Sequence, residues 1–232
     1  MKTLLKVNNL RIDFCRDNKW QETVHGIDFE VFEGKTLGIV GESGSGKSVS
    51  NLAVMQLLNR RMSRISADSI LLEDKDISKL NDNEMTEIRG KKIAMIFQEP
   101  MTALNPVMKC GKQVMEMGVS KEKCLSLFQE VSLPNPEKIF SSYPHQLSGG
   151  QRQRVMIAMA LSCQPDILIC DEPTTALDVT VQKTVLDLIK QLQKKYNIGV
   201  IFITHDLGVV SQIADKVAVI YKGEIVEMAN KE

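Results

Sequence analysis

The sequence has no hydrophobic run near the roughly 18 residues that a membrane-spanning helix needs. Residues 1–6 (MKTLLK) are too short and too quickly polar for a secretory signal peptide. Net charge is also absent, because 29 Lys and Arg residues balance 29 Asp and Glu residues, and this disfavours nucleic acid as a partner. We therefore expect a soluble, intracellular protein that does not bind nucleic acid.

Paired cysteine motifs are missing as well. The five cysteines form no C-x-x-C pair, and an odd number in a large intracellular chain argues against a disulfide framework or a zinc site. We expect small, mostly buried apolar residues at Cys15, Cys110, Cys124, Cys163 and Cys170. The chain also lacks internal repeats and low-complexity segments, and its 232 residues suffice for a large core with a small satellite.

A phosphate-binding loop is the most informative feature that is present. The pattern G-x-x-x-x-G-K-[ST] is fitted by Gly41, Glu42, Ser43, Gly44, Ser45, Gly46, Lys47 and Ser48. An apolar strand at 37–40 precedes it, and an amphipathic helix follows, with apolar residues through Leu58. The glycines let backbone N–H groups surround phosphate oxygens. Lys47 would then reach the β- and γ-phosphates and Ser48 would ligate Mg²⁺, so the sequence predicts binding of a nucleoside triphosphate.

Strands and helices alternate along most of the chain. Residues 4–40 predict two or three strands of an antiparallel front end, and a further strand pair is expected at 69–72 and 92–97, with a polar loop and short helix between them. Prolines break residues 105–144 into short helices, which indicates a satellite subdomain. The remainder predicts a parallel sheet with helices on both faces, from helices at about 149–162, 179–196 and 207–214 and strands at 167–170, 199–203, 217–221 and 224–226.

Two carboxylates end the apolar strand 167–170. In a nucleotide-binding sheet, Asp171 fits Mg²⁺ binding through water, and Glu172 could polarise an attacking water. A second anion site is expected where Ser148 caps a helix ahead of Gly149, Gly150 and Gln151. A capped helix start alone does not explain two glycines there, because they cost helix stability.

Further motifs follow in a set order. They are Gln98 after a strand, the pentapeptide at 147–151, Asp171-Glu172, Ala176-Leu177-Asp178, and Thr204-His205-Asp206. Together with the phosphate loop, this series resembles the ATP-binding subunit of an ABC transporter, whose signature motif is the pentapeptide LSGGQ. The resemblance covers nearly the whole chain. It implies an α/β P-loop ATPase fold with a mixed β-sheet core, an N-terminal antiparallel β subdomain and a helical subdomain.

The resemblance also implies roles for individual residues. Gln98 contacts Mg²⁺ and senses the γ-phosphate, Glu172 is the catalytic carboxylate, and His205 holds the γ-phosphate and the attacking water. Two such domains meet head to tail, so that ATP lies between the phosphate loop of one and the signature helix of the other, with Asp178 in the D-loop. Val49 joins the nucleotide-binding residues. An aromatic residue should stack on adenine, and Phe14 occupies that place where the family usually has Tyr or Trp, with Trp20 as the alternative.

The segments 96–106, 143–145 and 171–180 look like those of dipeptide, oligopeptide and nickel importer ATPases. Two departures stand against this: the region between Gln98 and Leu147 is shorter than usual, and the sequence given stops at Glu232 without the C-terminal extension of many peptide-importer ATPases. A compact nickel-type subunit, the first half of a fused double ATPase, and a piece of a longer protein would each fit.

We therefore expect one ABC ATPase domain over 1–232, with a nucleotide-binding core at 1–98 and 161–232 and a helical subdomain at about 99–160. ATP hydrolysis would drive import of peptides or nickel. The subunit would lie in the cytoplasm, peripheral on the inner face of the membrane, with permease subunits and a second ATPase subunit as partners and an extracellular solute-binding protein as an indirect one. A DNA-repair or ribosome-associated ABC ATPase and a simple P-loop kinase or GTPase are the alternatives.

The segment 99–106 after Gln98 carries two prolines, which deny it regular structure. Met101 and Leu104 are expected to be exposed there as an apolar surface. The resemblance implies that this surface receives a short helix of the permease. The alternative is a loop that only packs on the helical subdomain.

Overall fold

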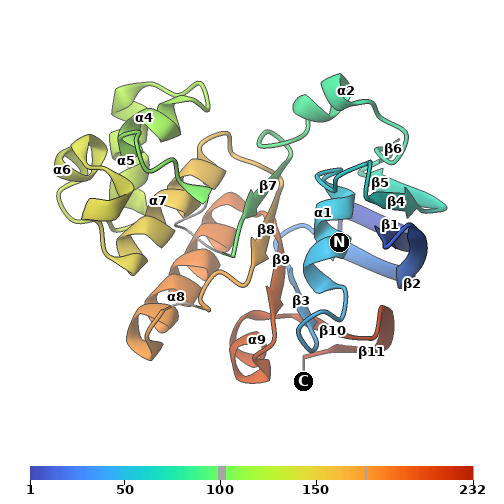
Figure 1. The fold of residues 1–232 in the computed structure, drawn as a ribbon. Helices are drawn as coiled ribbons and strands as arrows, with labels where there is room; N and C mark the ends of the chain where they lie inside the picture. The colour runs from blue at the N-terminus through green and yellow to red at the C-terminus, as the bar shows by residue number, and fades with distance from the viewer. Residues whose placement is uncertain (99–102, 176, 232) are drawn as a thin grey trace.

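Two β-sheets organise the chain (Figure 1). The structure is a computed structural model and describes residues 1–98, 103–175 and 177–231. The smaller sheet is antiparallel in the order β2-β1-β5-β6, with β4 also paired to β1. Its strands are β1 (Thr3–Arg16), β2 (Lys19–Phe32), β4 (Ser63–Ser66), β5 (Ser69–Leu72) and β6 (Lys75–Asp76).

The larger sheet has the order β11-β10-β3-β9-β8-β7 and is parallel except for β11, the outer strand that follows β10 by a tight turn. Its strands are β3 (Thr36–Val40), β7 (Ile93–Ile96), β8 (Ile167–Asp171), β9 (Gly199–Thr204), β10 (Lys216–Tyr221) and β11 (Glu224–Asn230). This mixed sheet agrees with the predicted core.

Helices cover the face of the larger sheet that points away from the smaller one (Figure 1). They are α7 (Gly149–Leu161), α8 (Val179–Tyr196) and α9 (Leu207–Ile213), and beside them lies a lobe of α4 (Cys110–Met115), α5 (Lys121–Glu130), α6 (Pro136–Ser141) and the 3-10 turn Pro144–Gln146. On the opposite face are α1 (Lys47–Val54) and α2 (Asp82–Thr86). No helix within the described residues is long and apolar enough to cross a bilayer.

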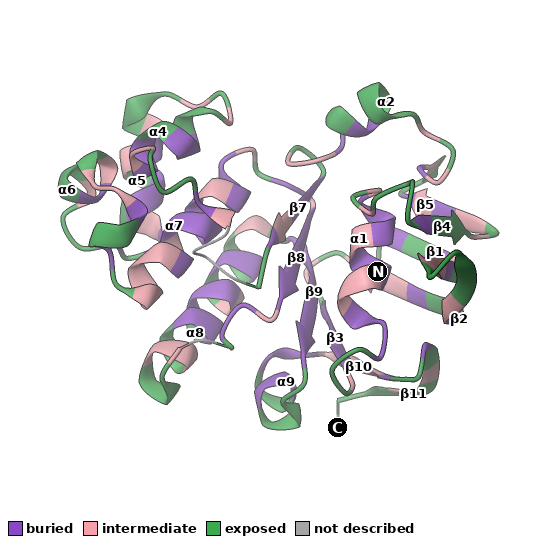
Figure 2. Ribbon diagram, in the orientation of Figure 1, coloured by how far each residue is buried: buried purple, intermediate pink, exposed green. Residues whose placement is uncertain are grey.

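The central strands β3, β8 and β9 of the larger sheet are buried on both faces because each face is covered. In β9, Ile201 and Ile203 pack into the cluster shared with the smaller sheet, whereas Val200 and Phe202 pack against the helices. Alternate residues of a strand point to opposite faces, so a continuous apolar run is what a doubly covered strand requires. Figure 2 shows these three strands in the colour of buried residues, and every residue of each is buried. They form a rigid base for the loops that follow their carboxyl ends.

The expected pairing of 69–72 with 92–97 is wrong. Both segments are strands, but β5 pairs with β1 in the smaller sheet and β7 pairs with β8 in the larger one. Likewise, β3 leaves the antiparallel front end and lies between β10 and β9. Local patterns identify strands, whereas the choice of partner depends on contacts distant in the sequence.

The helix after the phosphate loop is also shorter than the apolar pattern indicates. It ends at Val54, and Gln56 adopts a left-handed backbone with φ 50°. The Arg89 guanidinium donates to the carbonyl oxygens of Met55 (2.8 Å) and Gln56 (2.9 Å), which satisfies the free carbonyl end of the helix. Leu57 is therefore released from the helix and is 42% exposed.

Candidate functional site

The phosphate loop lies between β3 and α1, as predicted. Three positions in the loop require glycine. Gly44 and Gly46 have φ of 78° and 109°, in the region that favours glycine. Gly41 is required for a different reason: a Cβ there would overlap the carbonyl oxygen of Ile220. A Cβ at Gly44 would meet nothing within 4 Å, so this part of the loop faces open space. The loop thus has a packed side and an accessible side.

Lys47 is buried beneath the loop. Its Nζ donates to the carbonyl oxygens of Gly41 (2.8 Å) and Glu42 (2.7 Å), which holds the loop curved around the ammonium group. Burial lowers the pKa of Lys47, while the nearby carboxylates of Glu172 and Asp171 act in the opposite direction. A cation is therefore held in place before any anionic ligand arrives.

Asp171 is the last residue of β8, and its side chain contacts the start of α1. The hydroxyl of Ser48 donates to its Oδ1 at 2.8 Å, so the fold brings together two residues that are 123 positions apart. Burial raises the pKa of Asp171, and the bond from Ser48 opposes the rise. The pair offers two oxygen atoms beside the loop.

Glu172, the residue after Asp171, is the centre of a separate cluster of polar side chains. Its Oε2 accepts hydrogen bonds from Thr175 Oγ1 (2.9 Å) and Gln98 Nε2 (3.1 Å), and its Oε1 lies 3.4 Å from Nδ1 of His205. The residue has φ 45°, an unfavourable backbone conformation for a side chain of this kind. The strand end therefore aims a carboxylate at the space between Gln98 and His205.

A cavity of about 350 Å³ joins these groups to the phosphate loop. Phe14 lines this cavity, whereas Trp20 is not among its lining residues and instead stacks with the Arg64 guanidinium, 3.8 Å from the ring centroid. The lining consists of Phe14, Cys15, Arg16, Thr23, Ser43, Gly44, Gly46, Lys47, Ser48, Val49, Met62, Gln98 and Glu172. Of the two aromatic candidates, Phe14 is thus the one beside the loop.

The signature residues stand apart from that cavity. Ser148 accepts from the Gln151 N–H (3.3 Å) and Gln151 Oε1 accepts from the Ser148 N–H (3.0 Å), which makes a capping box at the start of α7. Gly150 has a packing reason that the sequence did not reveal, since a Cβ there would lie 2.8 Å from Val181 Cγ1 of α8. Asp178 caps α8 in turn, by accepting from the Val181 N–H at 2.9 Å. None of these residues lines the cavity at Lys47.

The expectation of an exposed apolar segment after Gln98 is wrong for Leu104, which is 1% exposed. The buried amide of Gln113 accepts from the Asn105 N–H (2.9 Å) and donates to the Asn105 carbonyl (3.0 Å). The Gln113 side chain thus supplies hydrogen-bond partners to the N–H and C=O groups of an irregular backbone segment. Leu104, just before that segment, packs in the hydrophobic core beneath the helices. Met101 lies outside the described residues. Thr175 was not predicted as a site residue. The signal was its hydroxyl three residues after Glu172, within reach of that carboxylate.

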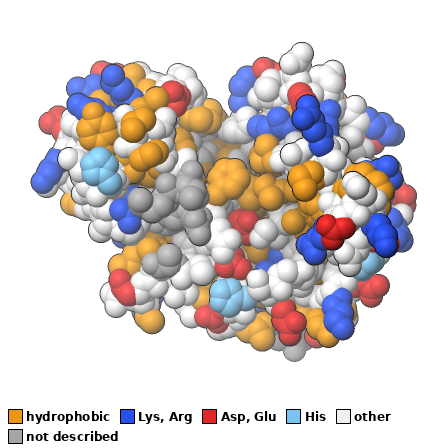
Figure 3. All heavy atoms as spheres, in the orientation of Figure 1, with side chains coloured by type: hydrophobic (Ala, Val, Ile, Leu, Met, Phe, Trp, Pro, Cys, Tyr) orange, Lys and Arg blue, Asp and Glu red, His pale blue; other side chains and the backbone are white. Residues whose placement is uncertain are grey.

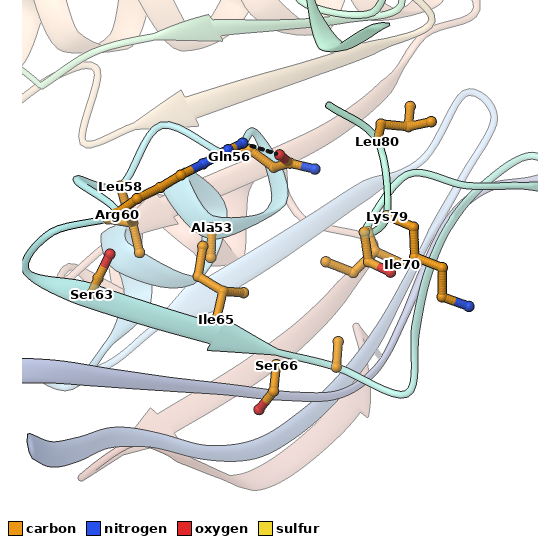
Figure 4. A pocket seen from close by; sticks show the side chains of 12 residues that line it. Ala53, Gln56, Leu58, Arg60, Ser63, Ile65, Ser66, Ile70, Lys79 and Leu80 are labelled. Carbon is orange, nitrogen blue, oxygen red and sulfur yellow. Dashed lines mark hydrogen bonds between the residues drawn. The ribbon is translucent and has the colours of Figure 1, made fainter. Parts of the chain in front are cut away.

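A larger cavity, of about 480 Å³, lies away from this site, between α1, β4 and the segment before α2 (Figure 4). Several of its polar groups already have partners: Arg60 donates to Gln56 Oε1 (3.2 Å) and to Asp82 Oδ1 (2.9 Å), and Ser78 donates to Asp76 Oδ1 (2.7 Å). Size alone therefore does not make it the functional site. The convergence of cation, carboxylates and open loop favours the cavity at Lys47.

Comparison with known proteins agrees with this geometry. The ABC transporter family model matches residues 24–175. The oligopeptide transport ATP-binding protein AppD of Bacillus subtilis is 49% identical over 99% of this chain and 73% of its own length. The dipeptide transport ATP-binding protein DppD of the same species is 46% identical over 100% and 72%. The glutathione import ATP-binding protein GsiA of Escherichia coli is 50% identical over 99% of this chain but 39% of its own length.

Solved structures show the same fold. The ATP-binding cassette MJ0796, in a dimeric post-hydrolysis state bound to ADP and Pi, has a TM-score of 0.86 and 26% identity, over 98% of this chain and 99% of that one. CbiO1 from Clostridium perfringens has a TM-score of 0.83 and 25% identity, over 100% and 90%. The predicted fold class is confirmed by these likenesses. Because the family model spans well over half of the sequence and the relatives align along nearly all of it, the chain belongs to the ABC transporter family, as an ATP-binding and ATP-hydrolysing subunit of an importer.

Proposed function

We propose that this chain energises peptide import by hydrolysing Mg²⁺-ATP at the cavity beside Lys47. The observation that carries the proposal is the cluster of Gln98, Thr175 and His205 around the Glu172 carboxylate, next to a phosphate loop with an accessible side. The relatives named above are peptide, dipeptide and glutathione transport proteins, and none of the three is named for nickel. Peptides are therefore the favoured solute class.

The oxygen atoms of Ser48 and Asp171 fit Mg²⁺, which prefers hard oxygen ligands. No group of three or more His, Cys, Asp or Glu side chains within the described ranges could hold a metal by itself. This agrees with a Mg²⁺ ion that takes its other ligands from phosphate and water, with Gln98 also in reach of the site. When bound, the ion would offset charge on the β- and γ-phosphates.

The chain's own residues then have separate tasks. The loop amides, that of Ser45 among them, and Lys47 hold the phosphates. Ser43 and Val49 line the same cavity, and Phe14 stacks on adenine. Glu172 accepts the proton of the attacking water, and Gln98 and Thr175 fix the orientation of its carboxylate. His205, whose side chain is 57% exposed, is free to hold the γ-phosphate and that water.

Two such chains, or this chain and a related subunit, would meet head to tail. The exposed Ser148 at the start of α7 and Asp178 at the start of α8 lie outside the cavity that holds Lys47, which supports their action on the partner's nucleotide. The proposed division of the chain is a nucleotide-binding core at 1–98 and 161–232 and a helical subdomain at about 99–160. Permease subunits would hold the ATPase on the inner face of the membrane, and a solute-binding protein would act from outside.

A groove between the sheets and the helical lobe is a better candidate for the permease contact than the segment 99–106. It encloses about 300 Å³ and is lined mainly by apolar residues, five of them methionine: Met55, Leu57, Arg89, Gly90, Ala94, Met95, Phe97, Ala103, Met117, Met156, Met159 and Ala160. On the face drawn in Figure 3, hydrophobic side chains gather between the two lobes. Phe97 borders this groove directly before Gln98, so a permease segment seated there would sense movement of Gln98.

Leu57→Asp tests this surface. It places a charge in the groove without touching the residues around Glu172, and loss of a buried leucine contact costs about 2 kcal/mol, or roughly thirtyfold in affinity. We expect co-purification with the permease and ATP-driven peptide uptake in proteoliposomes to fall, while the ATPase rate of the isolated subunit is unchanged. Val226→Asp, at another exposed apolar residue (58%), is the matched control. Normal assembly of Leu57→Asp with the permease would reject the groove.

Uptake itself tests the solute class. The ATPase, reconstituted with its permease and solute-binding protein, should take up labelled di- and oligopeptides and hydrolyse ATP faster in their presence. Stimulation by Ni²⁺ without any response to peptides would overturn the peptide assignment and leave the ATPase assignment intact.

A further inference from the structure

The turn between β10 and β11 lies directly against the phosphate loop, although about 180 residues separate them. Lys222 and Gly223 both have positive φ, 46° and 82°, which gives the tight turn that closes this hairpin. The Gly223 N–H donates to the carbonyl oxygen of Ser45 at 3.0 Å, and the Gly223 carbonyl accepts from the His25 N–H at 2.9 Å. One buried residue thus ties the loop to strand β2.

Other contacts join the same three elements. A Cβ at Gly41 would overlap the carbonyl oxygen of Ile220 at the end of β10. A Cβ at Gly46 would lie 3.1 Å from Val24 of β2 and 3.8 Å from the Cα of Gly223. The packed side of the phosphate loop is therefore supported by β10, its turn and β2 together.

Gly223 has no room for a side chain either. A Cβ on it would overlap the carbonyl oxygen of Thr23 and would lie 2.7 Å from Cδ2 of His25. Thr23 itself lines the nucleotide cavity. Relief of that overlap requires the turn to move away from β2, and the hydrogen bond from Gly223 to Ser45 moves with it.

We propose that Gly223 is a positioning residue for nucleotide binding, which acts by holding the phosphate loop at Ser45 against strand β2. The inference rests on the proposed role of residues 41–48 as the phosphate-binding loop. It assigns to the C-terminal hairpin a task in ATP affinity, in addition to its place in the sheet. Gly223 does not touch the ligand; it keeps the loop amides aimed at the accessible side, where phosphate oxygens would accept from them.

Gly223→Ala and Gly118→Ala form a matched pair. Gly118 has φ 83°, nearly that of Gly223, but a Cβ there would meet nothing within 4 Å, so both variants carry the same backbone strain and only one displaces a neighbour. Displacement of the loop weakens charge-assisted bonds to phosphate, so we expect the Kd for ATP, measured by titration calorimetry, to rise about tenfold in Gly223→Ala. Gly118→Ala should stay within about twofold of wild type. Equal affinities in the two variants would overturn the proposal.

Two further measurements separate failure of the inference from failure of the phosphate-loop assignment or of folding. Lys47→Ala should lose ATP binding; if it kept wild-type affinity, the phosphate loop itself would be wrongly assigned and the inference would fall with it. If Lys47→Ala loses binding while Gly223→Ala does not, only the inference fails. Should Gly223→Ala not fold, hydrogen exchange of the wild-type chain decides: ATP is expected to slow exchange at the Gly223 amide and not at the Gly118 amide, and unchanged exchange at both would reject the linkage.

Discussion

Glu172→Gln is expected to bind ATP with nearly wild-type affinity and to hydrolyse it about 10²- to 10⁴-fold more slowly. Glutamine has the shape of glutamate, and its carbonyl oxygen can still accept from Thr175 Oγ1 and Gln98 Nε2, so the cluster keeps its geometry. What is lost is the group that accepts the proton of the attacking water. Phosphate release under single-turnover conditions measures this step directly.

The same variant should accumulate as an ATP-bound dimer, because ATP that is not hydrolysed keeps favouring the closed state. Light scattering with and without Mg²⁺-ATP would show the change in mass. Glu137→Gln, an exposed carboxylate on α6, is the matched control and should behave as wild type. Turnover of ATP by Glu172→Gln at the wild-type rate would remove Glu172 from its catalytic role.

The motifs could be found from sequence because each depends on a local pattern. A strand followed by glycines, lysine and serine places the phosphate loop, and an apolar strand followed by two carboxylates places Asp171 and Glu172. The parallel arrangement of β8, β9 and β3 then brings these loops together at one edge of the sheet. The bond between Ser48 and Asp171 is the outcome of that topology.

Features that depend on distant partners could not be found in this way. The end of α1 is set by Arg89, more than 30 residues away, and the burial of Leu104 depends on the amide of Gln113. The hydrogen bond from Gly223 to Ser45 joins the C-terminal hairpin to the phosphate loop. In each case, a backbone group finds its hydrogen-bond partner outside its own segment, and no local pattern records the pairing.

Ser148→Arg should abolish hydrolysis while leaving the affinity of the isolated chain for ATP within about twofold of wild type. Ser148 is exposed at the start of α7 and is absent from the lining of the cavity at Lys47, so a bulky cation there obstructs a surface that acts on another chain's nucleotide. Arginine also removes the Ser148 hydroxyl, which caps α7 by accepting a hydrogen bond from the Gln151 N–H, and this loss costs about 1 kcal/mol of helix stability. Ser148→Ala removes the cap without the bulk and is the control for that loss.

The decisive result is expected in a mixture. Ser148→Arg has an intact phosphate loop and Lys47→Ala an intact signature helix, so a head-to-tail pair of the two regains one complete site out of two, and neither variant hydrolyses ATP alone. At equal concentrations, random pairing makes half of the dimers mixed, and the ATPase rate should return to about a quarter of wild type if each site works independently. A mixture as inactive as its components would count against independent composite sites. Loss of ATP binding by the isolated Ser148→Arg chain would go further, because it would place Ser148 and Lys47 in the same site and contradict the head-to-tail arrangement.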